Sequence, residues 1–177
     1  MRKAPARLST ERLVLRKPEA EDAERIFMRY ASDPEVTRYL SWRRHESAHE
    51  TRIFLGFSDA EWDRWPAGPY LIETPAGTLL GSTGFSFEGA REATTGYVLA
   101  RDAWGKGYAT EALRKVQSVG HELGVRRLTA QCHPQNLASL RVLEKCGFIR
   151  HRLHNRAEFP NLLPGVQVDV LTYSYPS

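Results

Sequence analysis

The spacing of apolar residues in the first hundred positions predicts a strand, three helical stretches and three more strands. Leu13 and Leu15 alternate with their neighbours, as in a half-buried strand. Apolar residues three to four apart predict a helix ending near Asp33-Pro34, because a proline disfavours helix in the residue before it. A short helical piece is predicted at 35–39, and a longer helix over about 46–63. The inward face of the longer helix is expected to hold Ile53, Phe54 and Phe57. Strands are predicted at 70–74, 79–87 and 94–100, with a Pro-Ala-Gly turn after the first and a polar connection at 88–93 before the last.

The second half of the chain alternates helices and strands. Gly124 is expected to end a helix whose apolar face holds Ala109, Ala112, Leu113, Val116, Val119 and Leu123. A strand at 127–132, a helix ending at Cys146, a strand at 148–153, a loop at 154–165 and a strand at 166–175 follow. This alternation, with a hairpin in the middle of the chain, predicts a mixed α/β sheet with helices on its faces.

Gly105 and Gly107 stand between the strand at 94–100 and the helix that follows it. Such a turn presents backbone N–H groups at the positive end of a helix, where phosphate is the preferred ligand. The spacing is neither a Walker loop nor the three-glycine dinucleotide fingerprint. From this chemistry alone, a tight turn without a ligand remains an equal alternative.

Composition limits the function further. The 177 residues predict a single domain over 1–177, and the chain has no apolar run of membrane-spanning length and no apolar signal core. We therefore expect a cytoplasmic protein without membrane contact. Cys132 and Cys146 do not suggest a disulfide framework, and no metal site is predicted. The net charge of +4 is spread along the chain, which does not favour nucleic-acid binding.

The glycine turn carries a family resemblance. Residues 104–112 (WGKGYATEA) resemble the acyl-CoA pyrophosphate loop, [Q/R]-x-x-G-x-[G/A], of the GNAT N-acetyltransferases. Trp104 replaces the Gln or Arg, as in the branch of ribosomal-protein N-terminal acetyltransferases of the RimJ/RimL type. Residues 10–16 resemble the opening strand of that branch, and 136–148 resemble its N-x-x-S…L-E-K-x-G-F signature. The resemblance spans roughly residues 8–150.

The resemblance implies the GNAT fold: a mixed, mostly antiparallel sheet with a central splayed parallel strand pair, flanked by helices. The pair corresponds to 94–100 and 127–133, and acetyl-CoA lies in the gap as co-substrate. The implied acetyl-CoA-binding residues are Tyr97, Val98, Leu99, Trp104, Gly105, Lys106, Gly107, Tyr108, Ala109, Thr110, Asn136 and Ser139. Asn136 is equally suited to cap a helix. Candidates for the outer phosphates are Lys106, Arg101, Arg141 and Lys145.

Acetyl transfer to an amine requires positioning, removal of a proton from the amine and stabilisation of the leaving thiolate. Many GNATs use a tyrosine for the thiolate where this chain has Leu143, and the resembled branch has a serine that matches Ser139. The glutamate that the branch carries before its Gly-Tyr pair is Thr94 here. The candidates for the proton acceptor, beside a water molecule, are Glu92, His133, Glu88 and Glu73.

The resemblance implies an enzyme that transfers an acetyl group directly to a primary amine, on a protein N-terminus or a small molecule, in a ternary complex. A homodimer is common in the family. The alternative is an acyl-CoA-binding sensor or partner module, favoured by the residues at positions 94 and 143. Trp42, Trp62 and Trp65 are candidates for lining the acceptor cleft, and core packing is the alternative for each.

Overall fold

The structure is a computed structural model that describes residues 2–151 and 155–176. Its strands are β1 (Arg7–Ser9), β2 (Val14–Arg16), β3 (Pro69–Glu73), β4 (Leu79–Gly89), β5 (Glu92–Leu99), β6 (Arg127–Cys132), β7 (Ile149–Arg150), β8 (Asn155–Glu158) and β9 (Gln167–Pro176). They are ordered β1-β2-β3-β4-β5-β6-β9-β7, and β8 pairs with β9. Among the described strands, β5 and β6 form the parallel pair and the other pairs are antiparallel. The predicted fold class is thereby confirmed.

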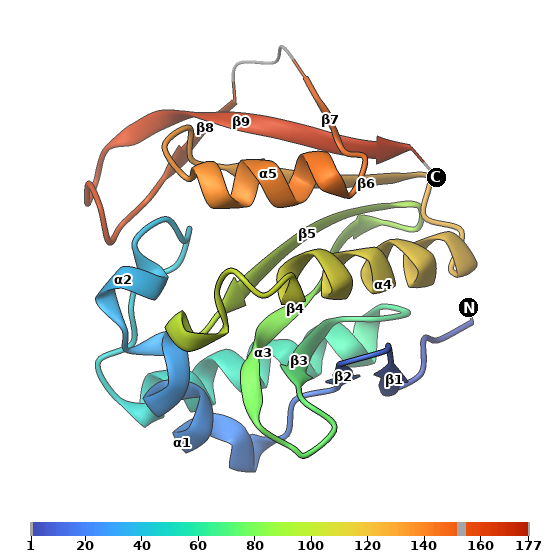
Figure 1. The fold of residues 1–177 in the computed structure, drawn as a ribbon, viewed down its shortest axis with the longest axis horizontal. Helices are drawn as coiled ribbons and strands as arrows, with labels where there is room; N and C mark the ends of the chain where they lie inside the picture. Colours follow the sequence, from blue (N-terminus) through green and yellow to red (C-terminus); the bar gives the residue numbers. More distant parts are fainter. Residues whose placement is uncertain (1, 152–154, 177) are drawn as a thin grey trace.

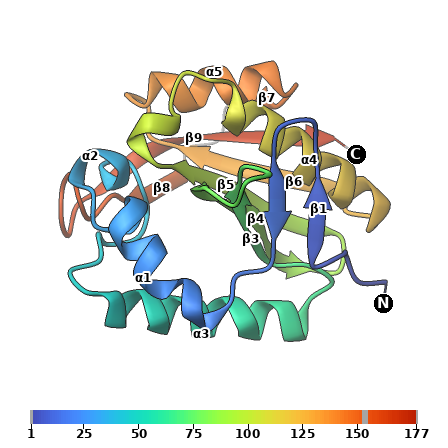
Figure 2. The same cartoon turned by 60° about the horizontal axis from the view of Figure 1, so that its bottom comes forward.

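Helices cover both faces of the sheet (Figures 1 and 2). The first half contributes η1 (Ala20–Asp22), α1 (Ala23–Ile26), the π-helical turn η2 (Phe27–Ala31), α2 (Pro34–Thr37) and α3 (Ala48–Arg64). The second half contributes η3 (Arg101–Ala103), α4 (Tyr108–Glu122) and α5 (Leu137–Lys145). None of the helices in the described part of the chain has the length and apolar character needed to cross a bilayer.

Neighbouring residues of the central strands belong to two different cores, because successive strand residues point to opposite faces. Leu71 of β3 and Val98 of β5 pack with α1 and α3, whereas Ile72 and Leu99 pack with α4. The centre of the sheet is therefore buried on both sides. Helix α4 buries the predicted apolar face, and Gly124, with φ of +77°, lies just beyond its end.

Two predictions about the first half are wrong. Ile53 and Phe57 were expected to face inward, but they are 51% and 67% exposed, and α3 instead buries Thr51, Leu55, Ser58 and Trp62. The opening strand is the second arm of a hairpin, because β1 precedes it and pairs with it. Val14 is buried together with Leu13 and Leu15, so the expected alternation is absent.

Three element boundaries also differ. The predicted connection at 88–93 is shorter, because β4 reaches Gly89 and β5 begins at Glu92. The strand predicted at 148–153 is limited to β7, and the last two of its predicted residues lie outside the described part of the chain. The loop predicted at 154–165 contains β8, which pairs with β9.

Candidate functional site

A cleft opens where β5 and β6 diverge. Their register runs only from Glu92–Arg127 to Thr94–Thr129, whereas β5 stays paired with β4 as far as Leu99. Among the described strands, none pairs with the edge of β5 that faces β6 beyond Thr94, so its polar groups can bind an extended ligand. The cleft measures about 580 Å³ and is lined by β4, β5, β6, the start of α5, β8 and residues 39–42.

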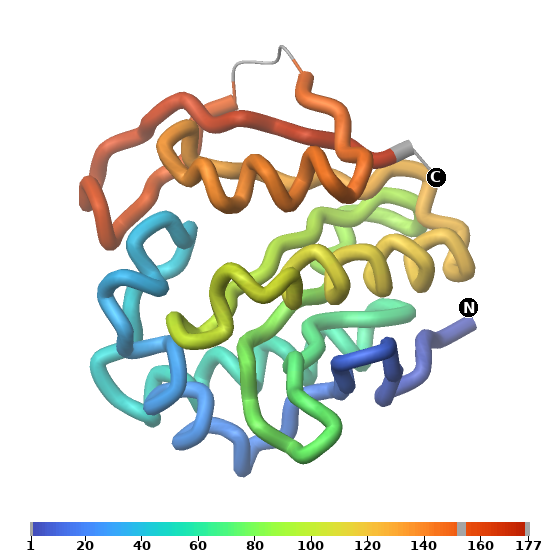
Figure 3. Tube along the Cα trace, viewed as in Figure 1, coloured from blue at the N-terminus to red at the C-terminus, as the bar shows by residue number. Residues whose placement is uncertain are grey.

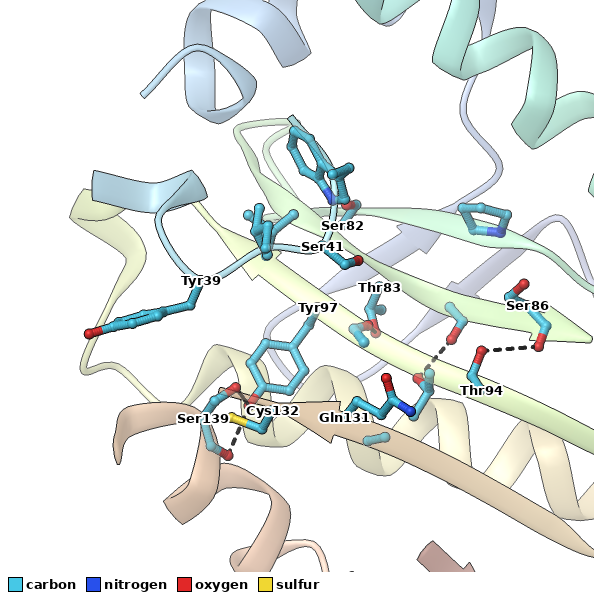
Figure 4. Close-up of a pocket in the computed structure, with 18 of the residues that line it drawn as sticks. Tyr39, Ser41, Ser82, Thr83, Ser86, Thr94, Tyr97, Gln131, Cys132 and Ser139 are labelled. Atoms are coloured by element: carbon cyan, nitrogen blue, oxygen red, sulfur yellow. Dashed lines mark hydrogen bonds between the residues drawn. The ribbon is translucent and has the colours of Figure 1, made fainter. Parts of the chain in front are cut away.

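Tyr97 crosses the divergence from β5 toward α5 (Figure 4). Its hydroxyl lies 2.7 Å from Oγ of Ser139 and donates to the Ser139 carbonyl at 3.1 Å. Burial raises the pKa of the Tyr97 phenol and raises that of the neighbouring Cys132 thiol to about 11. Tyr97 therefore remains a hydrogen-bond donor at neutral pH, in contact with the serine that was predicted to act on the leaving group.

The start of α5 holds Ser139 in place. Oδ1 of Asn136 accepts a hydrogen bond from the Ser139 N–H at 3.3 Å and caps the helix. Asn136 and Ser139 both line the cleft. The cap uses Oδ1, so that Asn136 can offer its Nδ2 group to a ligand.

The glycine turn lies beyond the end of the cleft, past Val98. Gly105 and Gly107 have φ of +73° and +79°, a region that favours glycine. The N–H of Glu111 donates to the Gly107 carbonyl at 3.1 Å and closes the first turn of α4, which leaves the preceding amides at the helix end. The indole of Trp104 donates to the Leu99 carbonyl at 2.8 Å, which ties the turn to β5.

Arg12 braces the glycine turn from the β1–β2 hairpin. Its guanidinium donates to the Lys106 carbonyl at 2.9 Å and to Glu111 at 2.7 Å, and it lies over the ring of Tyr108. Glu111 also accepts from the hydroxyl of Thr10 at 2.6 Å. Glu111 is the acidic residue in the first turn of α4, and Arg12 compensates its charge beside the anion site. Sequence reasoning missed this brace, because about a hundred residues separate its partners.

Glu111 is expected to stabilise the fold at neutral pH and to lose that effect in acid. Burial raises the pKa of its carboxyl, but the hydrogen bonds from Thr10 and Arg12 outweigh burial and hold the pKa below 4.5. A carboxyl whose pKa is lower in the folded than in the unfolded state stabilises the fold at any pH above its unfolded-state pKa. This stability is lost as the pH falls through the folded-state pKa. Glu111→Gln is therefore expected to lower the free energy of unfolding by about 1 kcal/mol at neutral pH.

Urea denaturation of both proteins between neutral pH and about pH 3 measures this contribution. The difference from the parent is expected to shrink as the pH falls below about 4.5. The matched control is Glu11→Gln, which changes an exposed carboxylate next to Arg12. If Glu111→Gln lowers the free energy of unfolding by the same amount at every pH, the charge of Glu111 does not stabilise the fold.

His133 lies behind the wall at the other end of the cleft. Its ring stacks on Tyr39 and meets the edge of Phe159, with centroids 5.0 and 4.8 Å apart. Burial, and then the charge of Arg38, lowers the pKa of His133, so that the ring is neutral at neutral pH. Nδ1 accepts the N–H of Gln135 at 3.1 Å, and the neutral ring therefore carries its proton on Nε2.

The other acidic candidates are placed differently. Glu92 is half-exposed at the start of β5 and pairs with Arg127 at 2.7 Å, outside the residues that line the cleft. Glu73 is buried and pairs with Arg16 at 2.9 Å. Glu88 of β4 lines the cleft and follows Ser86, which is in register with Thr94.

The remaining candidates divide between the cleft and the core. Trp42 lines the cleft, whereas Trp62 is buried and donates its indole N–H to the Pro69 carbonyl at 2.8 Å. Trp65 stacks on Phe87. Arg101, a candidate for the outer phosphates, pairs with Asp33 at 2.6 Å. Within residues 2–151 and 155–176, no group of three His, Cys, Asp or Glu is arranged to hold a metal ion.

Comparisons with known proteins agree with this geometry. The family described as "Acetyltransferase (GNAT) domain" matches residues 12–149. The uncharacterized N-acetyltransferase p20 of Bacillus licheniformis is 34% identical over 151 residues, which cover 82% of this chain and 84% of that protein. The uncharacterized N-acetyltransferase YoaA of Bacillus subtilis is 32% identical over 171 residues, 94% of each chain.

Among solved structures, one similar fold is that of RimL, described as a ribosomal L7/L12 alpha-N-protein acetyltransferase in complex with coenzyme A. Its TM-score is 0.83 at 22% identity, with 97% of this chain and 96% of that chain covered. This likeness concerns the fold. The roles predicted for individual residues of the cleft and of the glycine turn remain predictions.

Proposed function

The chain belongs to the GNAT acetyltransferases and is an acyl-CoA-dependent acetyltransferase. We propose that it transfers the acetyl group of acetyl-CoA directly to a primary amine. The observation that carries the proposal is the open edge of β5. It leads from the glycine turn, past Leu99 and Val98, to the paired hydroxyls of Tyr97 and Ser139.

Acetyl-CoA fits this path by its chemistry. Its diphosphate matches the N–H groups at the start of α4, and the amides of its pantetheine arm match the free edge of β5. The thioester then reaches the divergence of the strands, close to Ser139. We expect Asn136 to bind the pantetheine arm. The similar fold of RimL is that of a complex with coenzyme A, which supports this choice of co-substrate.

The reaction needs no covalent enzyme intermediate. The amine nitrogen attacks the thioester carbonyl, the C–S bond breaks, and the sulfur leaves as a thiolate that takes up a proton. Oγ of Ser139 can donate a hydrogen bond to that sulfur when the single proton of the Tyr97 hydroxyl turns from the Ser139 carbonyl to Oγ, 2.7 Å away. The amine loses one proton as the amide forms, and this proton needs an acceptor within the cleft.

We propose that Glu88 accepts the proton that the amine loses. The predicted candidates Glu92 and His133 are engaged elsewhere, Glu92 by Arg127 and His133 by the Gln135 N–H at Nδ1. Glu88 is among the residues that line the cleft, and we propose that it supplies, from the adjacent strand, the acid that position 94 lacks. Thr83 is in register with Tyr97, and Glu88 lies further along β4, beyond Ser86, so we expect it to take up the proton through a chain of water molecules in the cleft.

Glu88→Gln is expected to lower kcat about 100-fold, because a positioned general base contributes about 10²–10⁴ to the rate. The affinity for acetyl-CoA is expected to be unchanged. Glu92→Gln is the matched control, since Glu92 is a carboxylate at the start of β5 that pairs with Arg127 and does not line the cleft. Thiol release from acetyl-CoA over a range of pH measures both variants. A larger loss in Glu92→Gln than in Glu88→Gln reverses the assignment.

The acceptor is a protein N-terminus or a small primary amine. The cleft that receives it is lined by aromatic and hydroxyl side chains, among them Tyr39, Ser41, Trp42 and Ser82. We test the proposed function by thiol release with the tripeptide Ser-Ala-Ala and with tyramine as acceptors. Release that depends on either amine supports transfer. Binding of acetyl-CoA without amine-dependent release favours the alternative, a sensor or partner module.

A further inference from the structure

Asn161 joins the two walls at the acceptor end of the cleft. Its Nδ2 group donates to the Thr37 carbonyl and to the Trp42 carbonyl, both at 2.8 Å. Its Oδ1 accepts the N–H of Arg44 at 2.7 Å. One side-chain amide therefore makes three hydrogen bonds to the backbone that connects α2 with α3.

The two segments that Asn161 connects both line the cleft. Residues 39–42 contribute one wall, and Ala157 and Phe159 contribute the other, from the segment that leads to Asn161. The chain after α2 lies beside the turn between β8 and β9, at the left of Figures 1 and 3. Behind this contact the ring of His133 stacks on Tyr39 and meets the edge of Phe159.

The polarity of these bonds requires an amide. The carbonyls of Thr37 and Trp42 only accept hydrogen bonds, and the N–H of Arg44 only donates. A carboxylate in place of the amide keeps the bond to Arg44 but presents an acceptor to two carbonyl oxygens. The contact therefore depends on the chemistry of Asn161 and cannot be made by a side chain of the same shape that lacks a donor.

We propose that Asn161 is a positioning residue for the amine acceptor, which it serves by fixing the Tyr39–Trp42 wall against the β8–β9 side of the cleft. The proposal rests on the proposed function, because the acceptor is the molecule that this wall contacts. The proposed acetyl-CoA site runs along β5 and the start of α4 and does not include Asn161. Loosening the wall is therefore expected to raise the KM for the amine and to leave the Kd for acetyl-CoA unchanged.

The test is Asn161→Asp, with Asn155→Asp as a matched control. Asn155 donates to the hydroxyl of Thr172 at 2.8 Å, and this bond survives the change because a hydroxyl can donate in return. With Ser-Ala-Ala and tyramine as acceptors, kcat/KM for the amine is expected to fall about tenfold or more in Asn161→Asp, through KM. The Kd for acetyl-CoA is expected to stay within about twofold of the parent.

Amide hydrogen exchange reports on the wall without any catalysis. The segment 38–45 is expected to exchange about tenfold faster in Asn161→Asp than in the parent, and at the parental rate in Asn155→Asp. Asn161→Ser, whose side chain is too short to span the contact, serves the same test if the aspartate variant does not fold.

Unchanged exchange at 38–45 overturns the role of Asn161 in the wall. An unchanged KM for the amine in a variant with faster exchange overturns its role toward the acceptor. If the parent acetylates neither probe, the proposed function fails in the parent itself, and the positioning role fails with it.

Discussion

Gly107→Glu is expected to reduce the affinity for acetyl-CoA by at least about 100-fold, because like charges brought together cost several kcal/mol. The substitution places a carboxylate at the N-cap of α4, among the N–H groups proposed to bind the diphosphate. It also forces a side chain into a backbone with φ of +79°, with a Cβ 3.3 Å from the guanidinium of Arg12. Isothermal titration calorimetry with acetyl-CoA measures the loss.

Gly77→Glu is the matched control for Gly107→Glu. Gly77 has a similar φ of +87° in the β3–β4 turn, and a Cβ there meets nothing within 4 Å. The two variants therefore have comparable backbone strain and the same added charge, but Gly77 lies outside the proposed diphosphate site. The control is expected to bind acetyl-CoA like the parent. Equal affinities in a folded Gly107→Glu and in the parent contradict the proposed position of the diphosphate.

Ser139→Ala is expected to lower kcat about 100-fold while the Kd for acetyl-CoA stays close to the parental value, since the loss of one donor to a developing charge costs about 10²–10³ in rate. The alanine also leaves the Tyr97 hydroxyl without its closest partner, which lies at 2.7 Å in the parent. Single-turnover thiol release, with an amine that the parent acetylates, separates this effect from product release.

Tyr97→Phe shows whether the hydroxyl of Tyr97 or that of Ser139 acts on the leaving sulfur. It keeps the ring that crosses the divergence and removes only the group that donates to Ser139. A smaller loss than in Ser139→Ala is expected, because the serine hydroxyl itself remains. We expect the tyrosine phenol to support catalysis through the serine. A larger loss in Tyr97→Phe makes the phenol the direct donor to the sulfur, and unchanged turnover in Ser139→Ala removes the serine from the mechanism.

Helices α4 and α5 were predictable because their signals are local. The face of α4 follows from the spacing of its apolar residues, and the N-cap of α5 follows from Asn136. The splayed strand pair follows from the family resemblance, since the lengths of the two strands alone do not reveal where their register ends. The position of the glycine turn after β5 was likewise evident in the sequence.

The errors arise where tertiary contacts override the local pattern. Helix α3 buries the polar residues Thr51 and Ser58 and exposes Phe57, so that apolar spacing indicates the wrong face. Strand β8, with the sequence Asn-Arg-Ala-Glu, is polar and has no apolar alternation, and it forms because β9 offers it a pairing edge.

The parts of the site that sequence reasoning missed are contacts between distant segments. Arg12 reaches Lys106, and Asn161 reaches Trp42, across 94 and 119 residues. Neither residue type signals such a role by itself. The choice among the acidic residues was open for the same reason, because only the structure shows Glu92 paired with Arg127 and Glu88 in the lining of the cleft.

The most direct test of the central claim is titration of the parent protein with acetyl-CoA, followed in the same preparation by amine-dependent thiol release. We expect binding to the parent, release of coenzyme A that requires an amine, and loss of binding in Gly107→Glu but not in Gly77→Glu. Absence of acetyl-CoA binding to the folded parent contradicts the claim that the glycine turn and the open edge of β5 form its site.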